Sequence, residues 1–243
     1  MSANLLKGLY CGLTKPFPCS YLPKQDEQLL VITESPMDLP HYEALLGLGF
    51  RRNGDDVYRP HCPGCTACES LRLDVSAFEP DRGQRRILSK NRDVELRLSD
   101  ELDDRHFALY CAYIEARHRE GGMYPPSRAQ LERFAKASWM PLTLLDLYIK
   151  DELAACAITD ITANSLSALY TFFSPELPRR SLGKLAILKQ WQLARELGKQ
   201  WLYLGYHIEE CSKMNYKTSY CPHERFIAGR WFRFDQCFTA PPG

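Results

Sequence analysis

The chain has 243 residues, of which 45% are hydrophobic and 25% are charged, and its formal net charge is +1. This length suits one large domain or two smaller ones, and the composition is that of a soluble globular protein. The near-zero net charge excludes a general attraction for nucleic acid, so any such binding has to come from local basic segments.

No apolar run approaches the roughly 20 residues that span a bilayer. The first residues lack the charged and then apolar pattern of a signal peptide, so we expect a cytoplasmic protein. Ten cysteines are too few for a disulfide scaffold in a chain of this length. Without an export signal, they are expected to be reduced thiols or metal ligands.

Short elements are predicted in the first part of the chain. Residues 28–33 (QLLVIT) have the pattern of a buried strand, and a short helix follows over 42–48. Residues 70–75 alternate apolar and polar side chains, as a half-buried strand does. A basic helix is expected over 82–91 and a strand over 94–98.

From residue 102 onward, helical and strand patterns alternate in a defined order. The predicted elements are two helices (102–118 and 127–137), three strands (142–149, 153–159 and 167–173), a helix (181–197) and strands at 201–206 and 231–234. The Lys150-Asp151-Glu152 turn indicates a hairpin between the first two strands. This order is similar to that of N-acetyltransferase-like (GNAT) domains.

We therefore expect an α/β (α+β) fold with two domains. Residues 1–95 would form a small cysteine-containing N-terminal domain. Residues 96–243 would form a GNAT-like catalytic domain with a mixed central sheet.

Three cysteines are spaced as metal ligands. Cys62, Cys65 and Cys68 form two overlapping Cys-x2-Cys pairs, in which a tight turn points both thiolates at one ion. The fourth ligand stays open between Cys19, Cys11 and His61. The alternative is that these are packed or surface thiols. A hydrolytic metal is not expected, because histidine and carboxylate ligands are missing nearby.

Two cationic segments could bind phosphates. Residues 82–92 carry five cations and no acid, and on a helix such a stripe can track a phosphate backbone. The alternative is a solvated helix face. Arg180, Gly183 and Lys184 stand at the start of a predicted helix, where free amides and a glycine allow a phosphate to approach. This resembles part of the GNAT pyrophosphate loop, but Leu185 replaces its last small residue, which argues against acetyl-CoA.

Four segments resemble, in order, the aminoacyl-tRNA–protein transferases. They are 58–68 (YRPHCPGCTAC), 78–93 (FEPDRGQRRILSKNRD), 113–123 (YIEARHREGGM) and the pair YLGY at 203–206 and KMNYK at 213–217. The short length and the Cys-x2-Cys-x2-Cys pattern resemble the bacterial branch of the family, the aspartate/glutamate leucyltransferases, rather than the eukaryotic arginyltransferases.

The resemblance implies that leucine moves from Leu-tRNA to the α-amino group of a protein beginning with Asp or Glu. The product would carry a destabilising residue of the N-degron pathway. The chemistry would need no cofactor, while Cys19, Cys62, Cys65 and Cys68 could hold zinc or an Fe–S cluster. Alternatives are arginine transfer to the same acceptors, an acetyl-CoA-dependent GNAT enzyme, or a non-enzymatic RNA-binding or metal-sensing module built on residues 61–92.

The resemblance and the motif positions give the candidate site residues. Tyr206, Tyr216 and Lys217 would line the ester, and His118 is a candidate base. Candidates for tRNA phosphates are Arg180, Gly183, Lys184, Arg85, Arg86 and Lys90, and candidates for the acceptor carboxylate are Arg117 and Lys213. The alternative for the two tyrosines is aromatic packing, and for His118 it is a structural role. Because an α-amine has a pKa of about 8, the reaction needs a proton acceptor and a group that stabilises the oxyanion.

Overall fold

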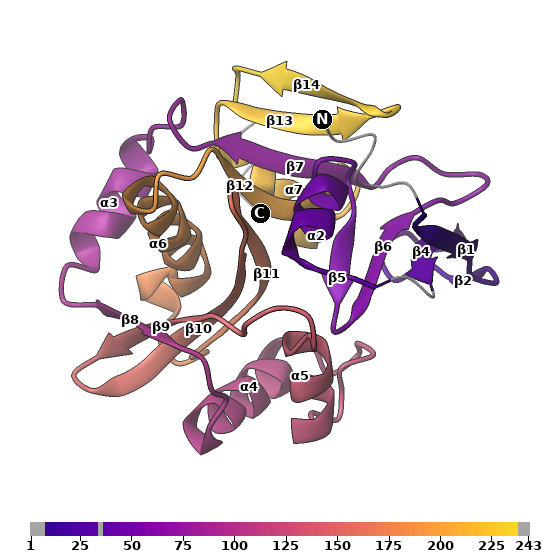
Figure 1. Cartoon of the computed structure of the whole chain (residues 1–243). Coiled ribbons are helices and arrows are strands. Elements are labelled where there is room, and N and C mark those ends of the chain that lie inside the picture. The colour runs from indigo at the N-terminus through magenta and orange to yellow at the C-terminus, as the bar shows by residue number, and fades with distance from the viewer. Residues whose placement is uncertain (1–7, 34–35, 238–243) are drawn as a thin grey trace.

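A large mixed sheet forms the centre of the computed structural model, which describes residues 8–33 and 36–237 (Figure 1). Across this sheet the strands are β14 (Arg230–Phe234), β13 (His223–Ile227), β7 (Glu69–Asp74), β12 (Trp201–His207), β11 (Ser165–Phe173), β10 (Glu152–Ile161), β9 (Leu144–Ile149) and β8 (Glu95–Ser99). Only β11 and β12 run parallel, and the other neighbours are antiparallel. The predicted α/β fold with a mixed central sheet is confirmed.

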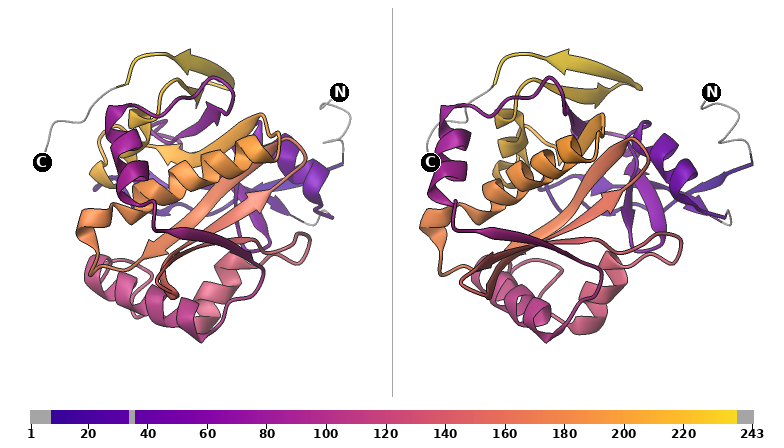
Figure 2. Two further views of the ribbon diagram at one scale, coloured as in Figure 1. Left: turned by 90° about the vertical axis from the view of Figure 1, so that its left-hand side faces the viewer. Right: turned by 60° about the vertical axis from the view of Figure 1, so that its left-hand side comes forward.

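Helices cover both faces of the sheet (Figure 2). On one face lie α3 (Arg82–Lys90) and α6 (Leu182–Glu196), which pack on strand residues such as Leu202 in a core with Trp191. On the other face lie α4 (Asp104–Arg117) and α5 (Arg128–Ala135), with a separate core. Successive strand residues point to opposite faces, which explains why the strands are apolar nearly throughout.

A smaller sheet is formed by the N-terminal part of the chain. Its strands are β1 (Tyr10–Leu13), β4 (Leu29–Thr33), β6 (Asp56–Pro60) and β5 (Arg51–Asn53), with α2 (Leu39–Leu46) beside them and a two-stranded pair, β2 (Phe17–Pro18) and β3 (Asp26–Glu27). Tyr42 of α2 packs with Tyr203 of the large sheet in one core. A buried ion pair, Arg52–Asp160, also joins the two sheets at 2.7 Å.

The local signals that set the element order are visible in the structure. The predicted order from residue 102 to residue 206 is confirmed. Ser127 caps α5 as predicted, and Asp81 forms a capping box with Gln84 at the start of α3. Lys150 and Asp151 both have positive φ, which matches a tight turn between β9 and β10.

Other elements follow from tertiary pairing and were not expected. The unexpected strands include β1, β5, β6 and β13. β7 lies between β12 and β13, so the large sheet contains residues from both sides of the predicted boundary at 95/96. Cys221 and Cys237 are joined as a disulfide, in contrast to the expected reduced thiols, because the β13–β14 hairpin brings their Cα atoms to 5.5 Å. No helix in the described ranges is both long enough and apolar enough to cross a membrane.

Candidate active site

The two parallel strands of the large sheet separate along their length and leave a gap. Residues 165–167 of β11 pair with residues 201–203 of β12. Beyond these pairs, β11 continues to Phe173 and β12 to His207 with no pairing between them. Carbonyl groups that face the gap therefore need partners other than a neighbouring strand.

Two cationic side chains supply those partners. Arg51 Nη2 donates to the carbonyl of Ala168 on β11 at 2.5 Å. Lys217 Nζ donates to the carbonyl of Tyr206 on β12. The 3-10 helix η2 (Tyr216–Ser219) carries Lys217, and β5 of the small sheet carries Arg51. Both parts of the chain thus contribute a side chain to the gap.

Gly205 allows the two cations to come close to the strand. Its φ is +84°, and a Cβ there would lie 3.6 Å from both Arg51 Nη2 and Lys217 Nζ. A positive φ strains any residue with a Cβ, and a side chain would also enter the space of the cations. A glycine inside a buried strand marks this close approach.

The environment of Lys217 favours its neutral form. The residue is only 6% exposed. Burial, and then the charge of Arg51, lower its pKa to about 7. A lysine with a pKa near neutrality can accept a proton at physiological pH.

Arg51 keeps a free hydrogen-bond donor beside this lysine. It is 5% exposed, and its Nη1 has no hydrogen-bond partner in the described residues. An unpaired buried donor is costly, and one aimed at a site suits a ligand oxygen. Arg51 was not among the predicted site residues. The sequence signal that could have found it is the Arg51-Arg52 pair inside the apolar surroundings of Phe50 and Val57.

The two predicted tyrosines lie in different settings. The Tyr206 hydroxyl donates to the carbonyl of Gly49 at 3.0 Å, so its ring joins β12 to the N-terminal part of the chain while its own carbonyl binds Lys217. Tyr216 is 37% exposed at the start of η2. Burial of its hydroxyl, with the charge of Tyr113, raises its pKa to about 12, so it remains a neutral donor at physiological pH.

The predicted base and acceptor-binding residues lie near the end of β11. His118 ends α4, and its Nε2 is 3.4 Å from the hydroxyl of Tyr113. Burial, and then the charges of Lys213 and Arg117, lower the pKa of His118. The guanidinium of Arg117 lies 5.1 Å from the ring centre of Phe173. The structure thus brings Arg117, His118 and Lys213 together.

The start of α6 has the form of an open anion site. Ser181 is left-handed and its side chain makes no cap, so the first amides of the helix stay available. A Cβ on Gly183 would lie 3.0 Å from the Phe173 ring, which explains the glycine. Lys184 is exposed.

Three of the other four predicted phosphate ligands already have protein partners. Arg180 forms an ion pair with Asp93 at 2.6 Å, and Lys90 Nζ donates to the Arg179 carbonyl at 2.6 Å. Arg85 donates to a backbone carbonyl, and Arg86 is exposed. These four residues lie around α3 and the start of α6, outside the gap between β11 and β12.

The predicted metal ligands lie in loops of the N-terminal part. Cys19 Sγ accepts hydrogen bonds from the amides two and three residues later, each at 3.4 Å. Cys62 Sγ accepts one from the amide of Gln28 at 3.4 Å. Amides directed at sulfur favour a thiolate, which is the form that binds a metal.

The four thiols are close enough to influence one another. Burial raises the pKa of Cys68 to about 12, and the thiols of Cys62, Cys19 and Cys65 add to this effect. Mutual repulsion between thiolates is what a bound cation would relieve. In donor type and in the direction of the amides, these residues fit a soft tetrahedral metal. In the structure, however, no three of their four sulfur atoms lie within 4.8 Å of one another.

A second cluster lies on α4, β9 and β10, away from the gap. Among the described residues, the only three metal-ligating side chains with atoms within 4.8 Å of one another are His106, Asp146 and Cys156. His106 caps α4 together with Asp103, and it also lies 3.1 Å from Asp146. Their ligand atoms are already used in hydrogen bonds, so this cluster fixes the start of α4 on the sheet.

Comparison with known proteins gives a consistent match over both parts of the chain. Residues 17–86 match the family described as arginine-tRNA-protein transferase, N terminus. Residues 105–227 match the family described as arginine-tRNA-protein transferase, C terminus. Together these ranges include the gap residues Arg51, Gly205 and Lys217.

Curated relatives match over nearly their full length. The aspartate/glutamate leucyltransferase of Aeromonas hydrophila is 50% identical over 228 residues, which cover 93% of this chain and 96% of that protein. That of Pseudoalteromonas atlantica is 47% identical over 220 residues, with 90% and 95% covered. That of Vibrio cholerae is 45% identical over 222 residues, with 90% and 95% covered.

Solved structures are more distant. FemX is 11% identical with a TM-score of 0.42, over 84% of this chain and 81% of that one. L-PGS from Bacillus licheniformis is 15% identical with a TM-score of 0.44, over 58% of this chain and 47% of that one. Structural similarity at this level says nothing about the function of this chain.

Proposed function

We propose that this chain, which belongs to the arginine-tRNA-protein transferase family, moves leucine from Leu-tRNA to proteins beginning with Asp or Glu. The chain is therefore an enzyme, an aminoacyltransferase whose substrates are an aminoacyl-tRNA and a protein. The choice of leucine rests on one observation, the near full-length match to relatives named aspartate/glutamate leucyltransferase. The product would begin with leucine, a destabilising residue in the N-degron pathway, and we place the reaction in the cytoplasm.

The gap between β11 and β12 supplies groups for aminolysis of an ester. The acceptor arrives as an ammonium, and neutral Lys217 takes one of its protons. The free amine attacks the ester carbonyl carbon, a C–N bond forms, and the oxyanion lies against the unpaired Nη1 of Arg51. When the C–O bond breaks, the ribose oxygen takes a second proton from the nitrogen. No covalent enzyme intermediate is needed.

The acceptor side chain would be recognised beside this gap. Arg117 and Lys213 are cations whose charges both reach His118. An arginine binds a carboxylate through two parallel hydrogen bonds, so Arg117 is the stronger candidate for the Asp or Glu side chain. His118 has a lowered pKa and would stay neutral beside these cations, as a hydrogen-bond partner of Tyr113.

The 3′ end of the tRNA would reach the gap past the start of α6. The free amides there, with Gly183 and Lys184, suit one phosphate close to the ester. The exposed ring of Tyr216 lies next to Lys217 in the sequence and offers a surface for stacking of the terminal base.

We also propose that Cys19, Cys62, Cys65 and Cys68 hold a structural metal, zinc or an Fe–S cluster. When bound, it would fix the loop that carries Cys68, whose charge reaches Lys217. The test is metal analysis of protein purified without oxygen, with Cys65→Ser as the variant. Retention of a full equivalent of metal by this variant would argue against the assignment.

The function is tested by a transfer assay on the purified protein. Radiolabelled Leu-tRNA or Arg-tRNA is offered with peptides that begin with Asp, Glu, Lys or Ala. Leucine transfer to the Asp and Glu peptides alone is the expected result. Arginine transfer to the same peptides would keep the family and overturn the donor. No transfer from either tRNA would overturn the proposal.

A further inference from the structure

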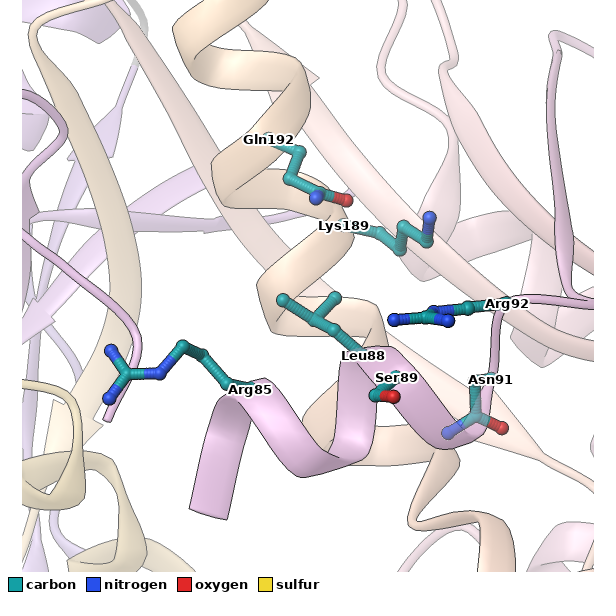
Figure 3. Close-up of a pocket in the computed structure, with 7 residues that line it drawn as sticks. All are labelled: Arg85, Leu88, Ser89, Asn91, Arg92, Lys189 and Gln192. Atoms are coloured by element: carbon teal, nitrogen blue, oxygen red, sulfur yellow. The ribbon is translucent and has the colours of Figure 1, made fainter. Parts of the chain in front are cut away.

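The helices α3 and α6 enclose a groove that the proposed mechanism does not use. The groove has a volume of about 420 Å³ and is lined by Arg85, Leu88, Ser89, Asn91, Arg92, Lys189 and Gln192. Figure 3 shows Lys189 and Gln192 projecting from α6, with Arg92 reaching in from the end of α3. A second hollow on the same helix adds Arg82 and Arg86. None of the lining residues is acidic.

Two of the three cations of this groove are free to bind a ligand. Within the described parts of the chain, Arg92 and Lys189 form no ion pair, as is also true of Arg82 and Arg86 in the second hollow, whereas Arg85 donates to the carbonyl of Pro80. Lys189 comes from α6, so the groove is more than the exposed stripe of one basic helix. Unpaired cations that converge from two elements create a local positive potential, which attracts an anion with several charges.

We propose that this groove binds the phosphates of the duplex part of the tRNA acceptor stem. This inference rests on the proposed function. The groove is lined by no aromatic side chain, whereas proteins that hold single strands stack bases on aromatic rings. A cationic groove without such rings binds backbone phosphates, and these contacts fix the register of a duplex. The single-stranded 3′ end is left for the start of α6.

The position of α3 supports this division. At one end, the Gln84 side chain donates to the carbonyl of Ser219, two residues after Lys217. At the other end, the Asn91 side chain donates to the carbonyl of Arg180, just before α6. A nine-residue helix is about 14 Å long, so α3, which lines the groove, spans the distance between the two segments that reach the ester site.

An anionic membrane is a weaker match for the same charges. A helix that lies on a membrane needs a free apolar face. Ile87 and Leu88, the apolar residues of α3, pack against the core formed with α6. The cations therefore surround a groove and do not flank an exposed apolar surface.

The inference is tested with the variant Lys189→Glu/Arg92→Glu. The matched control is Arg133→Glu/Arg230→Glu, which reverses two exposed cations on α5 and β14 that form no ion pair in the described residues. The probes are an acceptor-stem minihelix with its unpaired 3′ end, the unpaired 3′ oligonucleotide alone, and phosphatidylglycerol vesicles. Binding is measured by fluorescence anisotropy or co-sedimentation at several salt concentrations.

We expect the groove variant to bind the minihelix roughly 10-fold more weakly than the control, with a salt slope reduced by about 2. Its affinity for the unpaired oligonucleotide should not change. Equal minihelix affinity in both variants, or an equal loss for the minihelix and the oligonucleotide, would overturn the inference. So would lost vesicle binding with minihelix affinity intact.

The transfer assay separates this inference from the proposed function. The groove variant should raise KM for Leu-tRNA on the order of 10-fold and leave kcat at the wild-type value. Wild-type transfer with an unchanged KM in the variant would reject the groove and keep the function. An inactive wild-type protein would reject the function, while the minihelix measurement would still decide the groove.

Discussion

Arg51 and Lys217 place two buried cationic groups beside the same glycine, each 3.6 Å from the position that a Cβ on Gly205 would take. Repulsion between two cations in a buried site is relieved when one becomes neutral or an anion binds between them. The lowered pKa of Lys217 corresponds to the first outcome. An oxyanion formed during the reaction would provide the second.

Replacing Lys217 with methionine should remove most of the transfer activity. Methionine keeps much of the buried volume but cannot accept a proton, so we expect kcat to fall about 10²–10⁴-fold. In the wild type, kcat should rise with pH through an apparent pKa of about 7, as Lys217 becomes neutral. The measurement is kcat against pH at saturating substrates.

The acceptor amine also titrates, with a pKa of about 8. The pH profile of Lys217→Met shows how much of the pH dependence comes from the acceptor. That variant should keep only the acceptor ionisation in kcat/KM. Lys217→Arg, which keeps the positive charge and cannot become neutral, should be as inactive as Lys217→Met. A Lys217→Arg enzyme with wild-type kcat would contradict the role as a base.

Loss of Arg51 should change both the rate and the pH profile. Arg51→Met removes the free Nη1 donor, so we expect kcat to fall about 10²–10³-fold. It also removes a charge that lowers the pKa of Lys217, so the remaining activity should rise at a higher pH than in the wild type. Arg51→Lys keeps a positive charge, so its pH profile should lie closer to that of the wild type. A loss of rate with an unmoved pH profile would indicate a structural role only.

A methyl group at Gly205 should impair the site beyond its effect on the backbone. Gly205→Ala and Gly198→Ala both place alanine at a positive φ, but a Cβ at 198 meets nothing within 4 Å. Both variants should lose about 1–2 kcal/mol of unfolding free energy. Only Gly205→Ala should also lower kcat, because its Cβ enters the space beside the cations. Equal kcat values in the two variants would show that the space is not used in the reaction.

The unfolding free energy should depend on pH because Lys217 is buried. Its pKa falls from 10.5 to about 7 on folding, so between these values the unfolded chain holds one more proton and stability rises with pH. Below about pH 7 both states are charged and the full penalty of burial is present. The stability of Lys217→Met relative to the wild type should therefore be greater at pH 6.5 than at pH 9. The difference in urea unfolding free energy between the two proteins should change by at most about 1.4 kcal/mol per pH unit.

Breaking the ion pair between the two sheets should destabilise the whole fold. The side chains of Arg52 and Asp160 are each 1% exposed and lie 2.7 Å apart. Arg52→Met leaves Asp160 buried without its cation and should cost about 3–5 kcal/mol of unfolding free energy. The double variant Arg52→Met/Asp160→Leu should lose less than the single variant, because no charge is left unpaired. A larger loss in the double variant would contradict this explanation.

Local signals were sufficient for much of the fold. Apolar periodicity predicted the order of elements from residue 102 to residue 206, and Ser127 marked the start of α5. These elements depend on neighbouring residues in the chain, so they can be read from a short window of sequence. Lys217 became a candidate through the family resemblance of residues 213–217.

Sequence patterns did not predict strands that exist only through distant pairing. β5 has three residues and is stabilised by its pairing with β6. β7 reads as a half-buried strand, yet nothing local places it between β12 and β13. For the same reason, the basic residues of α3 did not reveal that Lys189 of α6 completes a groove.

The amino-acid sequence was sufficient to predict the order of helices and strands from residue 102 to residue 206 and to indicate the family. Which of the many cations are reactive or free depends on the tertiary fold. Arg180 is paired with Asp93, whereas Lys217 is buried beside Arg51 with a pKa near 7. Burial and charge act through space, and the fold brings together residues that no local pattern connects.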